Sequence, residues 1–414
     1  MSFGHARRTA WVLVLLSTPA TPTRATAQES NRFTELARRV VATSAAVKPG
    51  EVVVISGGKH TISLMEALGA EVARTGASPL LTLDSERVFG AFLRELPETH
   101  LRAYDSAGTA VYGDLLRRAD VMIVLPPIEN ADSLLQTFAA DTLRMGKVMQ
   151  TLGASQRRFD ELRNTARTRF VFINYPPTRT DIARSGLDAG AYDRMMWEAM
   201  TTDYDRIAAQ GRALKRLLDT GKSVRITTPD GTDLRLRLTG RPAAMIGATL
   251  PAAQRGARLA SQRTVTLPGG RVAVAPLETS ANGKVVVARD ACFGSPLVNA
   301  RFELRAGRMT GFQADSGGAC VTSFLESSPG PDDVMGVLSI GLNPALEPVE
   351  TGVGYRPWEA SGAVVLGLGN NSDLGGRNDT PAGFPFWLSR ATVEIDGKVV
   401  VKDGQVLSDL TQGR

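Results

Sequence analysis

The sequence predicts a two-domain protein, in which an α/β domain with a mainly parallel sheet precedes a mostly antiparallel β (α+β) domain. Its 414 residues exceed what a single hydrophobic core usually serves. Helical and strand patterns alternate in the first half, whereas strands separated by tight turns dominate from residue 222 onward. We therefore expect a leader at 1–27, an α/β domain with a bridging helix at 28–220 and a β-rich domain at 221–414.

The first 27 residues have the pattern of a secretory signal peptide. Arg7 and Arg8 precede a short apolar run, and Ala25-Thr26-Ala27 is a small-x-small cleavage site. Cleavage near Ala27 predicts a secreted or periplasmic protein; the alternative is an uncleaved anchor. The leader has three arginines and no acidic residue, so its loss lowers the net charge from +6 to +3. No later apolar run could span a bilayer, so we expect no membrane span after cleavage.

Composition and motifs argue against nucleic-acid and nucleotide binding. The chain has no dense basic patch with interleaved aromatic residues. The basic stretch at 157–170 is typical of a solvated helix face. The sequence also has no GxGxxG or Walker pattern, so it does not indicate a nucleotide ligand.

Apolar spacing predicts the elements of the α/β half in chain order. Polar turns separate them, and the alternation of helix and strand implies a parallel sheet covered on both faces. The expected helices are 32–46, 61–77 and a long amphipathic stretch at 190–218, and the expected strands are 52–56, 78–83, 121–127 and 169–177.

Alternating patterns and glycine-containing turns predict the elements of the second half. The clearest hairpin spans 223–240 and turns at Asp230-Gly231. We also expect a strand pair around Asn282-Gly283, a hairpin at 299–315 that turns at Ala306-Gly307, and strands within 362–369 and 391–407.

Cysteine and histidine are scarce. Cys292 and Cys320 are the only cysteines, and they form either a disulfide or two buried thiols. The mature chain keeps only His60 and His100, both in the first domain. A metal-free hydrolase would need a nucleophile beside such a base, and Ser63 near His60 is the candidate; the alternative is an exposed loop histidine.

Seven sequence blocks, in this order, resemble the thermophilic metallo-aminopeptidases of peptidase family M29, the aminopeptidase T and AmpS-like enzymes. The resemblance covers nearly the whole mature chain. The blocks are AVKPGEVVVI (46–55), VRITTPDGTDLRLRLTGR (224–241), LPGGRVAVAP (267–276), NGKVVV (282–287), MGVLSIGLNPAL (335–346), GAVVLGLGNN (362–371) and VEIDGKVVVKDG (393–404).

The resemblance implies a homodimeric aminopeptidase whose second domain holds two divalent metal ions, zinc or cobalt, with two glutamates, two histidines, a tyrosine and an aspartate. Metal ions need such oxygen and nitrogen donors, whereas a guanidinium offers only donors and a permanent positive charge. The matching positions here are Arg271, Val337, Val365, Ser372, Pro385 and Trp387. We therefore expect no metal cofactor at this site.

Charged residues near these positions suggest replacements. Glu359, Asp373 and Asp379 could form an oxygen-rich site for one Ca²⁺ or Mg²⁺ ion, or cap the turns of their own loop. Arg271 with Arg377 could bind the carboxylate of a peptide or a small acidic ligand. Alternatively, Arg271 pairs with Glu359 or Asp373 and only fills the space.

Together these patterns predict an exported, catalytically degenerate homologue of the aminopeptidases that acts in ligand binding or assembly. One alternative is an active metal-dependent aminopeptidase that removes N-terminal residues from peptides through non-standard ligands. Another is a purely structural protein without an open cleft.

Overall fold

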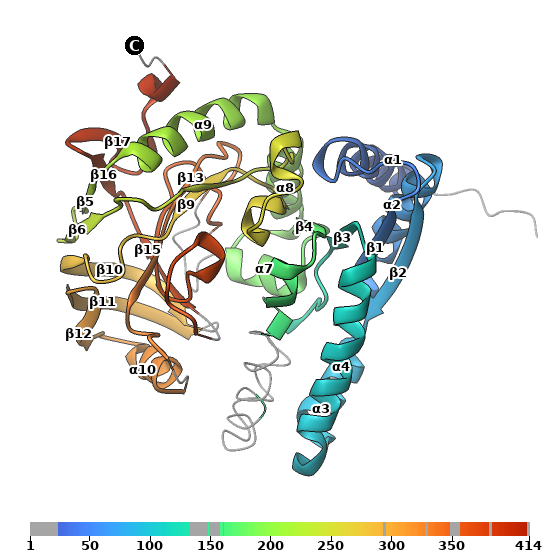
Figure 1. The fold of residues 1–414 in the computed structure, drawn as a ribbon, viewed down its shortest axis with the longest axis horizontal. Helices are drawn as coiled ribbons and strands as arrows, with labels where there is room; N and C mark the ends of the chain where they lie inside the picture. The colour runs from blue at the N-terminus through green and yellow to red at the C-terminus, as the bar shows by residue number, and fades with distance from the viewer. Residues whose placement is uncertain are drawn as a thin grey trace, which may run out of the picture.

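The computed structural model describes residues 24–131, 148, 158–159, 161–292, 295–327, 330–347, 357–380 and 383–411. It contains one parallel sheet with helices and two sheets that are antiparallel (Figure 1). The predicted fold class is therefore confirmed. In this part of the chain, no helix is both long and apolar enough to cross a membrane.

The parallel sheet, sheet A, has five strands in the order β2-β1-β3-β4-β8. Its central strands consist almost entirely of buried apolar residues, as expected for a sheet covered on both faces. The strands are β1 (Val52–Gly58), β2 (Ser78–Asp84), β3 (Val121–Val124), β4 (Arg169–Ile173) and β8 (Thr264–Leu267).

Helices cover the two faces of sheet A with separate apolar clusters. On one face, Val53 and Ile55 of β1 belong to the main core with residues of α1 (Arg24–Arg39) and α2 (Ile62–Arg74). On the other face, Val54 packs with Leu116 of α4 (Glu98–Arg118) and with Ala166. The alternation along β1 therefore directs neighbouring side chains to different helix layers.

The bridging stretch predicted at 190–218 is two helices rather than one. They are α8 (Ala189–Thr201) and α9 (Tyr204–Thr220). Asp203 separates them, because its side chain accepts hydrogen bonds from the N–H groups of Asp205 and Arg206 at the start of α9. Other helices in the described part of the chain are α3 (Glu86–Glu95), α7 (Arg179–Ser185) and α10 (Gly318–Ser327).

Two packed sheets form the second half of the molecule. Phe302 of sheet B and Phe386 of sheet C pack with tilted rings whose centroids lie 4.9 Å apart. Sheet B has the order β12 (Arg308–Gln313), β11 (Ser295–Arg305), β10 (Asn282–Cys292), β6 (Asp233–Arg237), β5 (Ser223–Thr227), β16 (Thr392–Ile395), β17 (Lys398–Lys402) and β18 (Gln405–Val406). Sheet C has the order β15 (Gly383–Leu388), β14 (Val364–Gly369), β13 (Met335–Gly341), β9 (Arg271–Val274) and β7 (Ala244–Ile246).

The hairpins predicted at 223–240 and 299–315 are confirmed as β5–β6 and β11–β12. The strand pair expected around Asn282-Gly283 is wrong. β9 and β10 lie in different sheets, and Gly283 of β10 instead pairs with Leu304 and Leu234. Local alternation predicts that a segment is a strand, but it does not say which strand it pairs with.

Cys292 and Cys320 form a disulfide between the end of β10 and α10, with Cα atoms 6.1 Å apart. The bond closes a loop that contains the β11–β12 hairpin. The disulfide therefore links α10 to β10, and the helix also contacts β11, the partner strand of β10.

β8 connects the two halves of the protein. It completes sheet A beside β4, although it follows the β5–β6 hairpin of sheet B in the chain. Arg263, 1% exposed, precedes it and donates to the carbonyl oxygens of Ala257 and Arg163, both at 2.8 Å, and of Thr168. Burial lowers the pKa of this arginine, so the three carbonyls are what stabilise its charge.

We expect Arg263→Met to lower the free energy of unfolding by about 3 kcal/mol, because three buried carbonyls lose their donor. Arg263→Lys should restore little, since one ammonium cannot reproduce the planar fork. Urea denaturation measures both. The exposed Arg235 on β6 gives a control, Arg235→Met, that should change stability by less than about 0.5 kcal/mol. Equal losses in the two methionine variants would contradict this role.

Candidate functional site

A glycine turn fixes the position of Arg271, the first residue of β9. A Cβ atom on Gly269 would lie 2.3 Å from the carbonyl oxygen of Thr266. A Cβ atom on Gly270 would lie 2.8 Å from the Ile207 side chain, and Gly270 has φ +120°. The sequence therefore needs both glycines to bring the backbone through this narrow passage.

Two buried polar side chains hold the same turn in place. The Tyr204 hydroxyl accepts from Gly269 N at 3.2 Å and donates to Ala199 O at 2.7 Å. Asn343 Nδ2 donates to the carbonyl oxygens of Gly269 at 3.0 Å and Ala199 at 3.2 Å. Burial raises the pKa of Tyr204, so the phenol stays neutral and keeps its proton for this donation.

Arg271 forms an ion pair with Glu359 at the end of this turn. Its Nε lies 3.1 Å from Glu359 Oε1, and the two side chains are 20% and 12% exposed. The guanidinium carbon also lies 5.0 Å from the centre of the Trp358 ring, a cation–π contact. Nε is buried and its contact with Glu359 is an ion pair without an aligned hydrogen bond, and no described residue accepts a hydrogen bond from Nη1 or Nη2.

Burial and charge act against each other in this pair. Burial raises the pKa of the Glu359 carboxyl, and the neighbouring Arg271 works to lower it. Burial also lowers the pKa of Arg271, and Glu359 opposes that change. Each group therefore depends on the other to remain charged in a poorly hydrated position.

The register of sheet C places the expected metal positions on one face. Ala273 and Val365 are the two cross-strand neighbours of Ser339, and Trp387 pairs with Val365. Arg271 lies two residues before Ala273 in the same strand, so it shares this face. Ser339 itself is fully buried, and its hydroxyl has no hydrogen-bond partner in the part of the chain that the structure describes.

The remaining strand positions of this set lie on the same face. Val337 comes two residues before Ser339, and Pro385 comes two residues before Trp387. Val337 packs into a small apolar cluster with Ala244, Ala273, Ala275 and Leu374. Apolar side chains thus fill much of the space over the strands that would carry metal ligands.

The chemistry of these side chains does not fit a dinuclear metal site. Of the six side chains at the expected ligand positions, only that of Ser372 has a hydroxyl oxygen, which is a weak metal ligand while neutral. This hydroxyl donates a hydrogen bond to Asn370 Oδ1 at 3.1 Å. Within the described ranges, no group of three or more histidine, cysteine, aspartate or glutamate side chains is arranged to hold a metal ion. We therefore derive no step that runs through a metal.

The other charged candidates do not gather around Arg271. Asp373 lies 3.9 Å from Arg163 Nη1 and accepts from Asn164 Nδ2 at 3.5 Å, so it contacts the α/β half. Arg377 is exposed, and its backbone N–H donates to Glu278 at 2.7 Å. Asp379 is exposed as well. Of the alternatives open to Arg271, the structure contains the pair with Glu359.

His60 follows β1 at the edge of sheet A where ligands often bind. Its Nε2 is buried and has no hydrogen-bond partner among the described residues, and Ser63 is exposed. Burial lowers the pKa of His60, against the carboxylates of Glu129, Glu86 and Asp181. The structure shows no hydrogen bond from Ser63 to His60, so it gives no support to a nucleophile–base pair.

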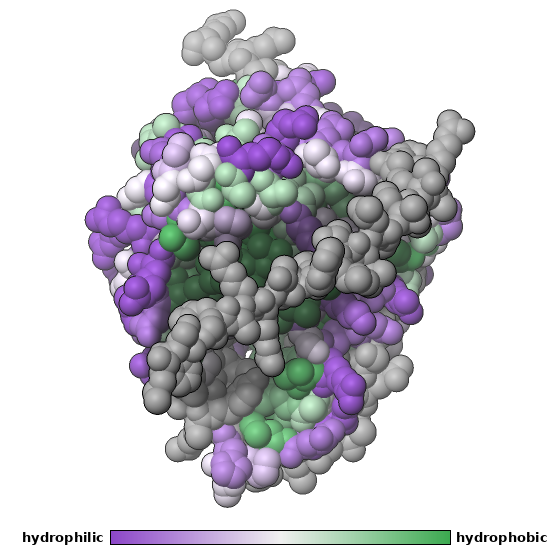
Figure 2. All heavy atoms as spheres, turned by 90° about the vertical axis from the view of Figure 1, so that its right-hand side faces the viewer, coloured by the Kyte–Doolittle hydropathy of each residue, from purple (hydrophilic) through white to green (hydrophobic). Residues whose placement is uncertain are grey.

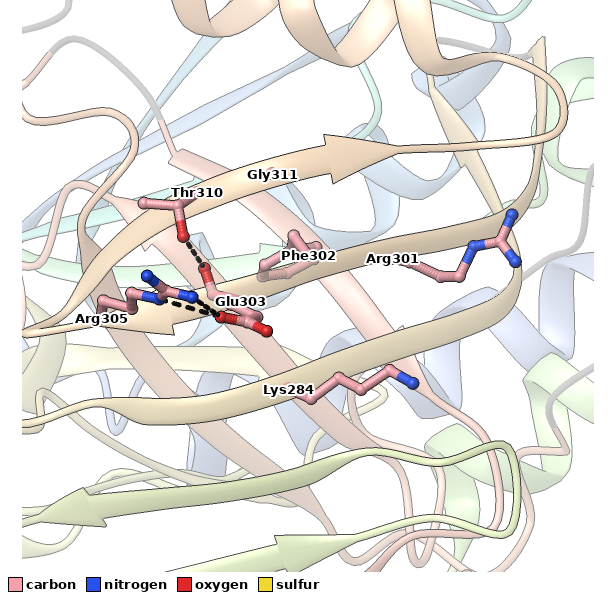
Figure 3. A pocket seen from close by; sticks show the side chains of 7 residues that line it. All are labelled: Lys284, Arg301, Phe302, Glu303, Arg305, Thr310 and Gly311. Carbon is pink, nitrogen blue, oxygen red and sulfur yellow. Dashed lines mark hydrogen bonds and ion pairs between the residues drawn. The ribbon is translucent and has the colours of Figure 1, made fainter.

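A separate groove of 440 Å³ lies on the exposed face of sheet B (Figure 3). The charges there are solvated or already paired: Arg305 donates to Glu303 at 2.7 and 2.9 Å, and Lys284 and Arg301 extend along the strands. The groove carries no nucleophile beside a base, and Arg271 lies in a different sheet. We therefore take Arg271 as the centre of the functional site.

Sequence reasoning anticipated Arg271 and Glu359 but missed three residues that position them. Trp358 lies beside Glu359 in the chain, so an aromatic neighbour of a candidate charge was the available signal. Tyr204 and Asn343 gave no local signal, because they reach the turn from α9 and from the end of β13.

Solved structures with similar folds include the following two proteins. Wild-type AmpT from Thermus thermophilus aligns with a TM-score of 0.70 and 17% identity, over 91% of this chain and 99% of that chain. A 2,5-dihydroxypyridine dioxygenase from Pseudomonas putida KT2440 aligns with a TM-score of 0.59 and 16% identity, over 92% of this chain and 98% of that chain. At these identities the likeness establishes the fold and leaves the chemistry open.

Sequence comparison identifies the family. The profile described as thermophilic metalloprotease (M29) matches residues 29–343. The matched range includes Arg271 and Val337 and ends before Val365, Ser372 and the strand that carries Trp387. No curated protein matches the sequence. Because the profile covers more than half of the chain and the fold agrees, the protein belongs to the M29 thermophilic metalloprotease family.

Proposed function

We propose that this chain is a metal-free member of the M29 family that binds the carboxylate of a peptide or small acidic ligand at Arg271. The observation that carries the proposal is the state of the guanidinium. Its Nε is buried and lies 3.1 Å from Glu359 Oε1 in an ion pair, and Nη1 and Nη2 have no hydrogen-bond partner among the described residues. Arginine grips carboxylates through two such parallel N–H groups.

The surroundings of Arg271 favour a planar anionic ligand. The Trp358 ring lies 5.0 Å from the guanidinium carbon, and this cation–π contact favours one orientation of the group. Ordering the donor before binding lowers the entropy that a ligand must lose. A carboxylate on the Nη edge would also lie close to Glu359, whose pKa is already raised by burial. Ligand binding should therefore be linked to proton uptake by Glu359.

The absence of metal chemistry in this proposal rests on the side chains themselves. Arg271 would stand where the first glutamate ligand of the family is expected, and its charge repels a divalent cation. Val337, Val365 and Trp387 contribute no donor atom on the same sheet face. Ligands from elsewhere would have to replace the whole set.

We also propose that the protein is exported after cleavage near Ala27. The basic residues, apolar run and Ala-x-Ala pattern of the first 27 residues support this. Helix α1 starts at Arg24, so cleavage there would remove only its first four residues. Phe33 and Leu36, two side chains through which α1 packs into the main core, would remain.

Elemental analysis tests the metal-free state directly. Residues 28–414, purified without chelators or a histidine tag, should contain fewer than about 0.1 divalent metal ions per chain. Incubation with added zinc, cobalt or manganese should leave the value unchanged. About two tightly bound ions per chain would instead favour the active aminopeptidase with non-standard ligands.

Calorimetric titration with trialanine and its C-terminal amide tests the carboxylate site. The acid should bind and the amide should bind at least about tenfold more weakly, because a neutral amide cannot accept two charge-assisted hydrogen bonds. Arg271→Met should weaken trialanine binding about 10- to 100-fold. Arg377→Met is the matched control and should leave the affinity unchanged. Equal affinity for acid and amide would refute the site and leave Arg271 as a filler of space.

The ion pair also predicts a pH-dependent stability for Arg271→Met. Without Arg271, burial holds the pKa of Glu359 further above its value in the unfolded chain. The folded state then binds this proton more tightly, so its stability falls as pH rises through that window. The variant should lose about 3 kcal/mol near pH 8 and less near pH 5, measured by urea denaturation. Adding Glu359→Gln should remove the pH dependence; a loss that is constant with pH would contradict the assignment.

A further inference from the structure

Sheet B has one buried face and one exposed face. Leu234, Leu236 and Phe302 belong to the buried face and to the main core, and the residues that alternate with them are exposed. Two grooves, of 440 and 470 Å³, lie on the exposed side of strands β5, β6 and β10–β12. We call this side the outer face of sheet B.

The α/β end of the molecule has a different surface composition. Figure 2 views the side that carries β2 and α2 in Figure 1, where apolar side chains gather in a hollow. The outer face of sheet B belongs to the other end of the molecule, at the left in Figure 1, and charged side chains line both of its grooves.

Arginines lie opposite each other at two places on the outer face. Arg225 of β5 is opposite Arg235 of β6, and Arg305 of β11 is opposite Arg308 of β12. Like charges directly opposite each other on neighbouring strands destabilise a sheet. An anion that binds between such arginines would remove their repulsion. We call these four residues the arginine row.

The two arginine pairs lie in one line across the strands. Asn282 of β10 lies between them: it is opposite Arg235, and the adjacent pair of Gly283 with Leu304 places Arg305 on its other side. From β5 to β12 the row crosses four strand spacings, or about 19 Å. This length suits a linear polymer better than a single small anion.

The acids of the outer face leave two arginines of the 470 Å³ groove without an ion pair. Asp233 accepts two hydrogen bonds from Arg225, at 2.9 and 2.8 Å, and Glu394 lies opposite the same arginine. Arg235 and Arg237 are exposed and line the groove, and neither forms an ion pair with a described residue. Their guanidinium groups are therefore available to a ligand.

Asp396 is the other acid of this groove, and its carboxylate already has hydrogen-bond donors. It accepts from the backbone N–H groups of Lys222 at 3.0 Å and Ser223 at 2.8 Å, and from the Ser223 hydroxyl at 2.8 Å. These bonds lower the pKa of Asp396, because they stabilise its charged form.

We propose that the outer face of sheet B binds an acidic glycan, a linear polysaccharide with repeated carboxylates, along the arginine row. Arginine binds carboxylates through two parallel N–H groups. Arg235 and Arg237 would bind first, since they have no ion pair to give up. Exposed ion pairs such as that of Arg225 with Asp233 contribute little to stability, so a polymer with many charges can compete for the other arginines.

The geometry favours a glycan over an acidic peptide or a nucleic acid. Strands β5, β6, β10 and β11 are paired on both sides, so a peptide strand would find no free backbone edge among them. Among the described residues that line the two grooves, Phe302 is the aromatic one, and at 3% exposed it offers no surface on which a base could stack. Neutral polar side chains, those of Asn282 and Thr310 among them, suit the hydroxyl groups of sugars.

Fluorescence anisotropy of a labelled polygalacturonate oligomer tests the proposal with residues 28–414. The wild-type protein should bind it, and the Kd should rise with added NaCl, because salt screens exposed charges. Arg235→Gln/Arg237→Gln should raise the Kd at least about tenfold. Arg212→Gln/Arg216→Gln is the matched control, since it removes two exposed arginines from α9, and it should change the Kd less than about twofold.

Competition identifies the chemistry of the partner. Unlabelled polygalacturonate should displace the probe, neutral dextran should not, and polyglutamate and single-stranded DNA should displace it at least about tenfold less well. Failure of the wild-type protein to bind at low salt, or equal Kd values in the two double variants, would overturn the proposal. Displacement by dextran would do the same, and so would a preference for polyglutamate or DNA. Arg271 lies in sheet C and takes no part in these measurements, so the two proposals can fail separately.

Discussion

The connection from β8 to β9 is the constraint on which the rest of the structure depends. β8 is hydrogen-bonded into sheet A and β9 into sheet C, so the three residues between them must cross from one sheet to the other. Neighbouring atoms leave no space for a Cβ at Gly269 or Gly270. The backbone path therefore places the residue that follows, Arg271, at the start of β9 between β13 and β7 of sheet C.

The contacts of Arg271 explain how an arginine is accommodated at this point. A carboxylate ligand set gathers negative charge, which a bound cation neutralises. Here Arg271 supplies positive charge from the protein itself, and Glu359 from the loop after β13 supplies the opposite charge. The pair is neutral in sum, and its desolvation penalty is lowered by close contact and by the Trp358 ring. The remaining positions of the same sheet face carry no charge, and all but the buried Ser339 are apolar.

Sequence patterns predicted those parts of the molecule that local physics determines. Alternation and Asp-Gly or Ala-Gly turns were enough for the β5–β6 and β11–β12 hairpins, and the buried run at 52–56 was enough for β1. Sequence patterns failed where contacts between residues far apart in the chain determine the structure. The run at 264–267 gives no sign that it pairs with β4, and the choice of Glu359 over Asp373 as partner of Arg271 depends on how two separate loops lie. Asp203 is a typical N-cap residue, but helical periodicity continues on both sides of it, so the sequence predicted one helix instead of two.

The order of sheet A places the Arg271 site beside one edge of that sheet. β2 and β8 are its two opposite edges, four strand spacings or about 19 Å apart. Three residues separate the end of β8 from Arg271, the first residue of β9. A ligand at Arg271 would therefore lie where sheet A passes into sheet C, and the residues on both sides of the glycine turn would position it.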